Sequence, residues 1–193
     1  MGSFMKDYFP EKTLQHKLIL GKFKKAAIQD DCNSFWRIWG EISEHGIIDK
    51  AMNFIKGSDC GKSIRLSFLE AWLKSSEGLR SECDDDIVLI NALWSLLPPY
   101  CGPAVQLYRG ETFWNRKRRT YGISWTSNRM VAASFMHNNT QMNNTGAVLL
   151  ETIAPSSAVI CAPCLLSEYR NEFEYIVDRR LLKEVKVIEK VCI

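Results

Sequence analysis

The chain has 193 residues, of which 46% are hydrophobic and 24% are charged, and its formal net charge is +3. This composition is typical of a folded globular domain and excludes a disordered or fibrous chain. The sequence lacks a run of about 18 apolar residues, which excludes a membrane-spanning helix, and its first residues lack the apolar stretch of a secretory signal. We therefore expect a cytoplasmic protein, acting either where it is made or after delivery into another cell.

The first hundred residues are predicted to be helical because apolar side chains recur at helical spacing. The predicted helices cover residues 14–27, 35–42, 47–55, 64–73 and 87–97. Aspartates at 84–86 favour the start of the last helix, since the helix dipole attracts negative charge there, and Pro98 ends it. Four tryptophans on these helices are expected in the core: Trp36, Trp39, Trp72 and Trp94.

The second half changes to strand-like alternation. Predicted strands cover residues 104–108, 146–153, 158–161, 173–177 and 182–191, with one short helix over 128–137. The fold class is therefore α+β, with a helical portion, residues 1–100, packed on a strand-rich portion, residues 101–193, as one compact unit.

Two motifs invite a functional interpretation that their spacing does not favour. Cys161 and Cys164 form a CxxC pair, but no second pair or nearby histidine follows, which favours buried free thiols over a zinc or redox site. The seven scattered cysteines fit a reducing compartment. Residues 57–63 look like a phosphate loop, yet three residues separate the glycines where the motif needs four, so a turn between helices is favoured.

A basic run occupies residues 115–119. Runs of charge most often form solvated loops. The alternative is a contact with a polyanion, either RNA or the phosphates of a cofactor. Flanking aromatic residues, Trp114 and Tyr121, favour a binding surface slightly because aromatic rings stack on bases. The cations of the run are Arg116, Lys117, Arg118 and Arg119.

Two glutamates, Glu172 and Glu174, stand at the start of the apolar run Tyr175-Ile176-Val177. In an extended strand, residues i and i+2 face the same side, about 6.6 Å apart. Both carboxylates would then project together, with Phe173 buried on the opposite face. Because like charges this close repel each other, we expect both to reach water or to hold a ligand between them.

Two further short motifs precede the glutamates in the chain. The first predicted strand ends in Tyr108-Arg109-Gly110, and a hydroxyl-rich segment, residues 124–127, leads into a helix. Each motif is weak alone, but the ordered set is much less frequent by chance. Across roughly residues 104–190 this set resembles the arginine–serine–glutamate class of mono-ADP-ribosyltransferases.

The resemblance implies a split β-sandwich with NAD, the ADP-ribose donor, in a central cleft between two small sheets, and no metal. It makes Arg109 the ligand of a cofactor phosphate, with Tyr108 and Gly110 beside it in the cofactor site. It makes Glu174 the catalytic residue that holds the ribose 2′-hydroxyl. Acceptor recognition would fall to Glu172 and to an aromatic in the preceding turn, Tyr169.

The resemblance also implies that the serine strand supports the catalytic glutamate and the nicotinamide ribose. The family's usual triplet is Ser-Thr-Ser, whereas here Trp125 lies inside it. We favour Ser124 as the functional serine, with Thr126 pointing the same way, and Ser127 is the alternative. The residue types suit the chemistry, because cleavage of the nicotinamide–ribose bond passes through an oxocarbenium-like state that a carboxylate stabilises, while a second carboxylate orients the nucleophile.

The leading hypothesis is a mono-ADP-ribosyltransferase that modifies a macromolecule, with protein arginine as the first acceptor and RNA or DNA bases as the alternative. Such an enzyme suits a bacterial or phage toxin, effector or defence component, with an inhibitor or antitoxin protein as partner; this step is analogy. Two further hypotheses remain. Water as the nucleophile would make it an NAD glycohydrolase, and Trp125 in the serine strand would suit an inactive binding module.

Overall fold

The structure is a computed structural model that describes residues 10–83, 85–142, 146–166 and 173–192. The chain divides into two compact units, Met1–Leu97 and Pro98–Ile193. Within the described residues, every strand lies in the second unit. The mixed helical and strand-rich composition is thus confirmed, and the division falls just before the expected boundary at residue 100.

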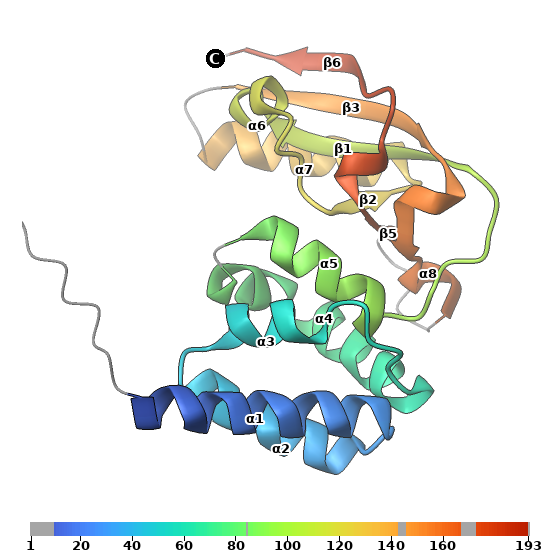
Figure 1. Ribbon diagram of the computed structural model, residues 1–193. Coiled ribbons are helices and arrows are strands. Elements are labelled where there is room, and N and C mark those ends of the chain that lie inside the picture. Colours follow the sequence, from blue (N-terminus) through green and yellow to red (C-terminus); the bar gives the residue numbers. More distant parts are fainter. Residues whose placement is uncertain (1–9, 84, 143–145, 167–172, 193) are drawn as a thin grey trace, which may run out of the picture. The chain divides into compact units, whose positions relative to one another are not determined.

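The N-terminal unit consists of helices (Figure 1). All the helices expected from the apolar spacing are present, and the structure extends or shifts their ends. Their bounds are α1 Pro10–Ile28, α2 Cys32–Glu44, α3 Ile48–Ile55, α4 Lys62–Glu82 and α5 Asp86–Leu96.

The connection between α3 and α4 is the segment that looks like a phosphate loop. The carboxylate of Asp30 accepts hydrogen bonds from the backbone N–H of Ser63 at 3.2 Å and of Ile64 at 2.9 Å, and from the Ser63 hydroxyl at 2.8 Å. These bonds, that of Ile64 above all, lower the pKa of Asp30. The amides that a phosphate would need at the start of α4 are therefore held by a carboxylate of the chain itself.

The core of the N-terminal unit contains aromatic rings, but of the four tryptophans expected there only Trp72 is buried, while Trp36 and Trp39 are half-buried. Phe23 and Phe35 stack with ring centroids 4.7 Å apart, and Trp72 is fully buried. The expectation is wrong for Trp94, which stands 36% exposed. Its helix, α5, is apolar nearly all round, so its spacing did not distinguish the buried face from the outer one.

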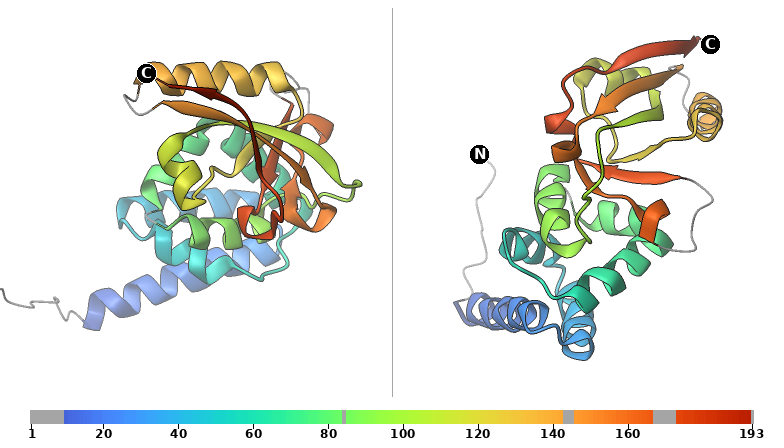
Figure 2. Two further views of the ribbon diagram at one scale, coloured as in Figure 1. Left: turned by 90° about the horizontal axis from the view of Figure 1, so that it is seen from above. Right: turned by 90° about the vertical axis from the view of Figure 1, so that its right-hand side faces the viewer.

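The C-terminal unit is built on one six-stranded antiparallel sheet in the order β4-β5-β2-β1-β3-β6. The strands are β1 Val105–Thr112, β2 Ser124–Thr126, β3 Ala147–Ala154, β4 Val159–Cys161, β5 Glu174–Val177 and β6 Lys186–Val191. The connections contain α6 Phe113–Arg118, α7 Arg129–Met142, α8 Pro163–Leu166 and the short 3-10 turns η1 Ser156–Ala158 and η2 Arg179–Leu181. Figure 2 shows β6, in dark red, beside β3 at one edge of the sheet.

The sheet has two three-stranded halves. β1 pairs with β3 over its full length, whereas among the described residues β1 and β2 share one pair, Tyr108 with Thr126. The halves β4-β5-β2 and β1-β3-β6 therefore meet at a single rung.

The two faces of the sheet carry different side chains. α7 packs against one face so closely that a Cβ on Gly110 would strike the α7 backbone at Ala132 and Met136. Glycine at this position thus allows the helix to approach the strand. The other face carries the larger apolar cluster, which includes Leu107, Trp125, Val148, Leu150, Tyr175 and Val177.

Candidate functional site

The three sequence motifs meet on three adjacent strands, β1, β2 and β5. Thr126 is paired with Tyr108 on one side and with Glu174 on the other. Directly paired residues of antiparallel strands have side chains on the same face. Tyr108, Thr126 and Glu174 therefore form one row across the sheet, and Ser124, two residues before Thr126, shares their face.

Trp125 has a structural role that explains its place between the hydroxyl residues. Its ring is buried, and its indole Nε1 donates to the carbonyl oxygen of Gly122 at 3.0 Å. Because side chains alternate along a strand, Trp125 enters the apolar cluster while Ser124 and Thr126 face the other way. Trp125 is thus the residue by which this segment differs from the family's Ser-Thr-Ser triplet, but it does not disturb the face that carries Ser124 and Thr126.

Ser127, the alternative serine, lies beyond the end of β2 and is exposed. Its backbone N–H donates to the carbonyl oxygen of Phe173 at 3.2 Å. In the turn that follows, the hydroxyl of Thr126 accepts from the N–H of Asn128 at 3.0 Å, and the side chain of Asn128 accepts from the N–H of Met130 at 2.9 Å. This turn fixes the start of α7 against the serine strand.

Arg109 starts on the opposite face from Glu174, since it follows Tyr108 by one residue. Its Nε donates to the carboxylate of Glu111 at 2.8 Å and its Nη1 to the carbonyl oxygen of Ser124. That oxygen points toward β1, because the main-chain groups of Ile123 and Ser127 bond to β5. The guanidinium therefore donates to the Ser124 carbonyl oxygen in place of the β1 backbone N–H that would do so in a continuous sheet. This bond connects the two halves of the sheet beside their single backbone pair.

Glu111 holds this arginine in place. The residue is only 2% exposed, and its carboxylate accepts four hydrogen bonds. The donors are Arg109 Nε at 2.8 Å, Asn115 Nδ2 at 2.9 Å, Thr112 N at 3.0 Å and Gly122 N at 3.0 Å. Burial alone would raise the pKa of Glu111, but the charge of Arg109 and these bonds outweigh it and hold the pKa below its ordinary value.

Gly122 gives the arginine its space. A Cβ built on Gly122 would overlap the guanidinium of Arg109, so a side chain there would displace it. Sequence reasoning missed both Gly122 and Glu111. The sequence contained one indication of Glu111: by strand alternation, Leu107, Arg109 and Glu111 share one face of β1. Two charged residues therefore follow an apolar one on a face that packs against the core.

The glutamate pair differs from expectation. β5 begins at Glu174, and Phe173 has a left-handed φ of 49° and is 43% exposed. The prediction of a buried Phe173 inside the strand is wrong, because a left-handed residue ends the extended alternation. Glu172 and Tyr169 lie outside the described residues.

Glu174 also influences a buried thiol. Burial first, and then the negative charge of Glu174, raises the pKa of Cys161 to about 12. Both members of the CxxC pair, Cys161 and Cys164, are buried free thiols. Among the residues that the structure describes, no three His, Cys, Asp or Glu side chains gather in a group that could hold a metal ion.

The basic run lies mostly on α6, a helix where a solvated loop was the first expectation. The Arg118 guanidinium stands 4.0 Å from the centroid of the Trp114 ring, and Trp114 is 53% exposed. Tyr121 is buried, so of the two flanking aromatics Trp114 alone is available at the surface.

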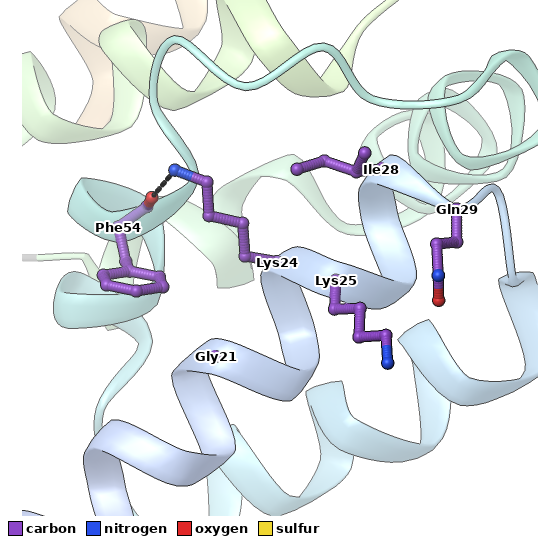
Figure 3. Close-up of a pocket in the computed structure, with 6 residues that line it drawn as sticks. All are labelled: Gly21, Lys24, Lys25, Ile28, Gln29 and Phe54. Atoms are coloured by element: carbon purple, nitrogen blue, oxygen red, sulfur yellow. Dashed lines mark hydrogen bonds between the residues drawn. The ribbon is translucent and has the colours of Figure 1, made fainter.

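A surface pocket of about 430 Å³ lies in the N-terminal unit, on α1 and α3 (Figure 3). Lys24 Nζ donates to the carbonyl oxygen of Phe54 at its edge, at 3.4 Å. The lining residues are Gly21, Lys24, Lys25, Ile28, Gln29 and Phe54. None of them belongs to the three motifs, so this pocket carries no part of the candidate site.

Comparisons with protein-family models, curated proteins and solved structures found no match. Within the described part of the chain, no helix combines the length and the apolar character needed to cross a membrane.

Proposed function

We propose that the protein is a mono-ADP-ribosyltransferase, which cleaves NAD and transfers ADP-ribose to a macromolecule. One observation carries the proposal: the arginine, serine and glutamate motifs, separated by up to 65 residues between Arg109 and Glu174, come to adjacent strands at the rung where the sheet divides. The split β-sandwich of this enzyme class is part of the proposal.

The donor set at this rung suits NAD. The Nε and Nη1 groups of Arg109 are bonded to Glu111 and Ser124, and no acceptor among the described residues takes Nη2. The side chain as a whole is about 20% exposed, and Nη2, which lies against Gly122, keeps its donors for a phosphate oxygen. Glu111 keeps the group oriented, which reduces the entropy lost when a ligand binds.

Glu174 is the proposed catalytic residue. It is half-buried, opens β5 and lies directly across from Thr126. In the reaction the C1′–N bond of the nicotinamide ribose breaks, and its electron pair leaves with neutral nicotinamide. A nucleophile on the acceptor then bonds to C1′ and loses its proton. A carboxylate on the ribose hydroxyl stabilises the positive charge that develops between these events.

The test is release of nicotinamide from NAD by the purified protein, with Glu174→Gln beside the wild type. We expect the variant to lose about 100-fold or more in rate, since removal of one group that stabilises transition-state charge costs this much. Glu189→Gln is the matched control, because Glu189 is an exposed glutamate of the same unit. Equal rates for wild type and Glu174→Gln would refute the assignment.

Labelled NAD with cell lysate then separates transfer from hydrolysis. Label that resists nuclease and is lost with protease identifies a protein acceptor, and label with the opposite sensitivity identifies a nucleic acid. Nicotinamide release without label identifies a glycohydrolase. Glu172→Gln is expected to lose transfer while keeping some hydrolysis, because the resemblance gives Glu172 to the acceptor.

A further inference from the structure

Among the described residues of the C-terminal unit, a cluster of exposed positive charge lies on α6 and the residue that follows it. Lys117, Arg118 and Arg119 are exposed, and no described acidic side chain forms an ion pair with any of them. By contrast, Arg180 is neutralised by a 2.7 Å ion pair with the buried Asp178. These three cations are therefore available to an external anion.

Two further arginines, Arg116 and Arg179, contact Tyr121. Arg116 Nη1 lies 3.3 Å from the Tyr121 hydroxyl oxygen, and Arg179 Nη1 donates to the Tyr121 carbonyl oxygen at 2.7 Å. One buried tyrosine thus contacts, at its two ends, arginines from α6 and η2, which are 63 positions apart in the chain. We call Arg116, Lys117, Arg118, Arg119, Arg179 and the Trp114 ring the α6 surface.

The α6 surface also offers flat groups. Trp114 is more than half exposed, and the Arg118 guanidinium lies over its ring at 4.0 Å. Aromatic rings and guanidinium planes are the groups on which unpaired bases stack, while neighbouring cations follow the phosphates. An acidic peptide would use the cations but would have no need of the ring.

A short chain of bonds connects the α6 surface to the candidate site. The Asn115 side chain, on α6, donates to Glu111 at 2.9 Å, and Glu111 in turn accepts from Arg109 at 2.8 Å. The same carboxylate therefore positions both the helix with the exposed cations and the arginine proposed to bind NAD. The first turn of α6 therefore lies next to that arginine.

We propose that the α6 surface binds single-stranded nucleic acid and that this strand is the acceptor of ADP-ribose. The inference rests on the proposed function and names its substrate class. In the transfer, a nitrogen or oxygen nucleophile of the strand bonds to C1′ as nicotinamide leaves with the electron pair of the broken bond. The proton lost by the nucleophile passes to solvent.

Binding is measured first, without NAD, by fluorescence anisotropy of single-stranded RNA and DNA of about 12 nucleotides, a length within the usual range of such sites, and of the matching duplex. We expect single strands to bind more tightly than the duplex, and the RNA and DNA arms to identify the sugar. Trp114→Ala should weaken single-strand binding about tenfold, with Trp114→Phe restoring most of it, because a stacked base contributes this much.

Charge is tested with the triple variant Lys117→Gln, Arg118→Gln, Arg119→Gln. Its slope of log affinity against log salt should be smaller by about 2, since each phosphate contact on a single strand contributes about 0.7. The matched control removes three exposed lysines from α1 in the other unit, Lys17→Gln, Lys22→Gln, Lys25→Gln. It has the same net charge as the first variant and should bind like the wild type.

Transfer is then followed with labelled NAD and the same oligonucleotides. Label on the single strand that is reduced in Trp114→Ala supports the inference. Equal binding by the wild type, Trp114→Ala and the triple variant overturns the inference. Label on protein, with none on the strand, while nicotinamide is released, also overturns it but leaves the proposed function intact. Absence of nicotinamide release, with strand binding intact, overturns the proposed function and the acceptor role together.

Discussion

Replacement of the buried carboxylate of Glu111 by the isosteric amide, Glu111→Gln, tests the account of the site most directly. Each carboxylate oxygen accepts two hydrogen bonds: Oε2 from Arg109 and Gly122, and Oε1 from Thr112 and Asn115. An amide keeps one oxygen and turns the other position into a donor. Whichever way it is oriented, two of the four donors lose their acceptor and face an N–H group instead.

The cost follows from these two lost acceptors. A buried donor without a partner costs about 1–3 kcal/mol, and loss of one partner of a buried ion pair about 3–5 kcal/mol. Because the Arg109 side chain retains about 20% exposure, it can turn partly to solvent, and we take about 3 kcal/mol as the loss in the free energy of unfolding. For a unit of roughly 100 residues this lowers the melting temperature by about 12–24 °C.

The assay is urea unfolding, with hydrogen exchange of peptides from β1 and β3 identifying the transition of the C-terminal unit. Glu189→Gln is the control, since that exposed carboxylate lies 3.7 Å from Arg129 and should contribute less than about 1 kcal/mol. If Glu111→Gln unfolds within about 0.5 kcal/mol of the wild type, the four bonds do not stabilise the unit and the positioning role given to Glu111 is wrong.

Three further predictions follow from the same structure. Gly122→Ala should displace the arginine guanidinium at a cost in stability of about 1–3 kcal/mol and, in the proposed reaction, raise the KM for NAD. Gly21→Ala, in open space on α1, should instead stabilise its helix by about 0.5–1 kcal/mol. Thermal unfolding measures the stability of both variants, and steady-state kinetics measures the KM. The pKa of Glu111 in the folded protein lies below its ordinary value of 4.5. Its contribution to the free energy of unfolding is therefore complete above pH 4.5 and is lost as the pH falls toward and through the folded pKa. The urea midpoint of the wild type should accordingly decline more steeply in acid than that of Glu111→Gln. Iodoacetamide should label the exposed Cys101 within minutes and Cys161, buried and with a pKa of about 12, far more slowly, and equal rates in a peptide map would contradict the burial of β4.

The helices of the first unit and the strands of the second were largely predictable, because burial of one face leaves a periodic trace in the sequence. α6 was not, since four basic residues in succession resemble a loop. Its start was nevertheless signalled by Thr112, whose hydroxyl accepts from the N–H of Asn115 at 3.2 Å and caps the helix.

The residues proposed for the site could be named from the sequence, but their arrangement could not. Arg109, Ser124 and Glu174 could be named from short motifs, whereas their meeting depends on the pairing of strands far apart in the chain. The partners of the arginine, Glu111 and Gly122, leave no periodic signal. The left-handed backbone conformation of Phe173 was missed because the φ angle of one residue leaves no pattern of side chains in the sequence.

The single rung between Tyr108 and Thr126 has a mechanical consequence. A sheet that is hydrogen-bonded along its full width resists bending evenly. Here, among the described residues, the bonds between β1 and the β2 segment are one backbone pair, the guanidinium of Arg109 and the bond from Gly122 N–H to Glu111. The line between β1 and β2 is accordingly the most compliant in the sheet, and torsion of one half against the other concentrates there. A ligand bound to the Arg109 guanidinium would reduce motion between β1 and β2. In the proposed function, this would be observed as slower amide exchange in β2 when NAD binds.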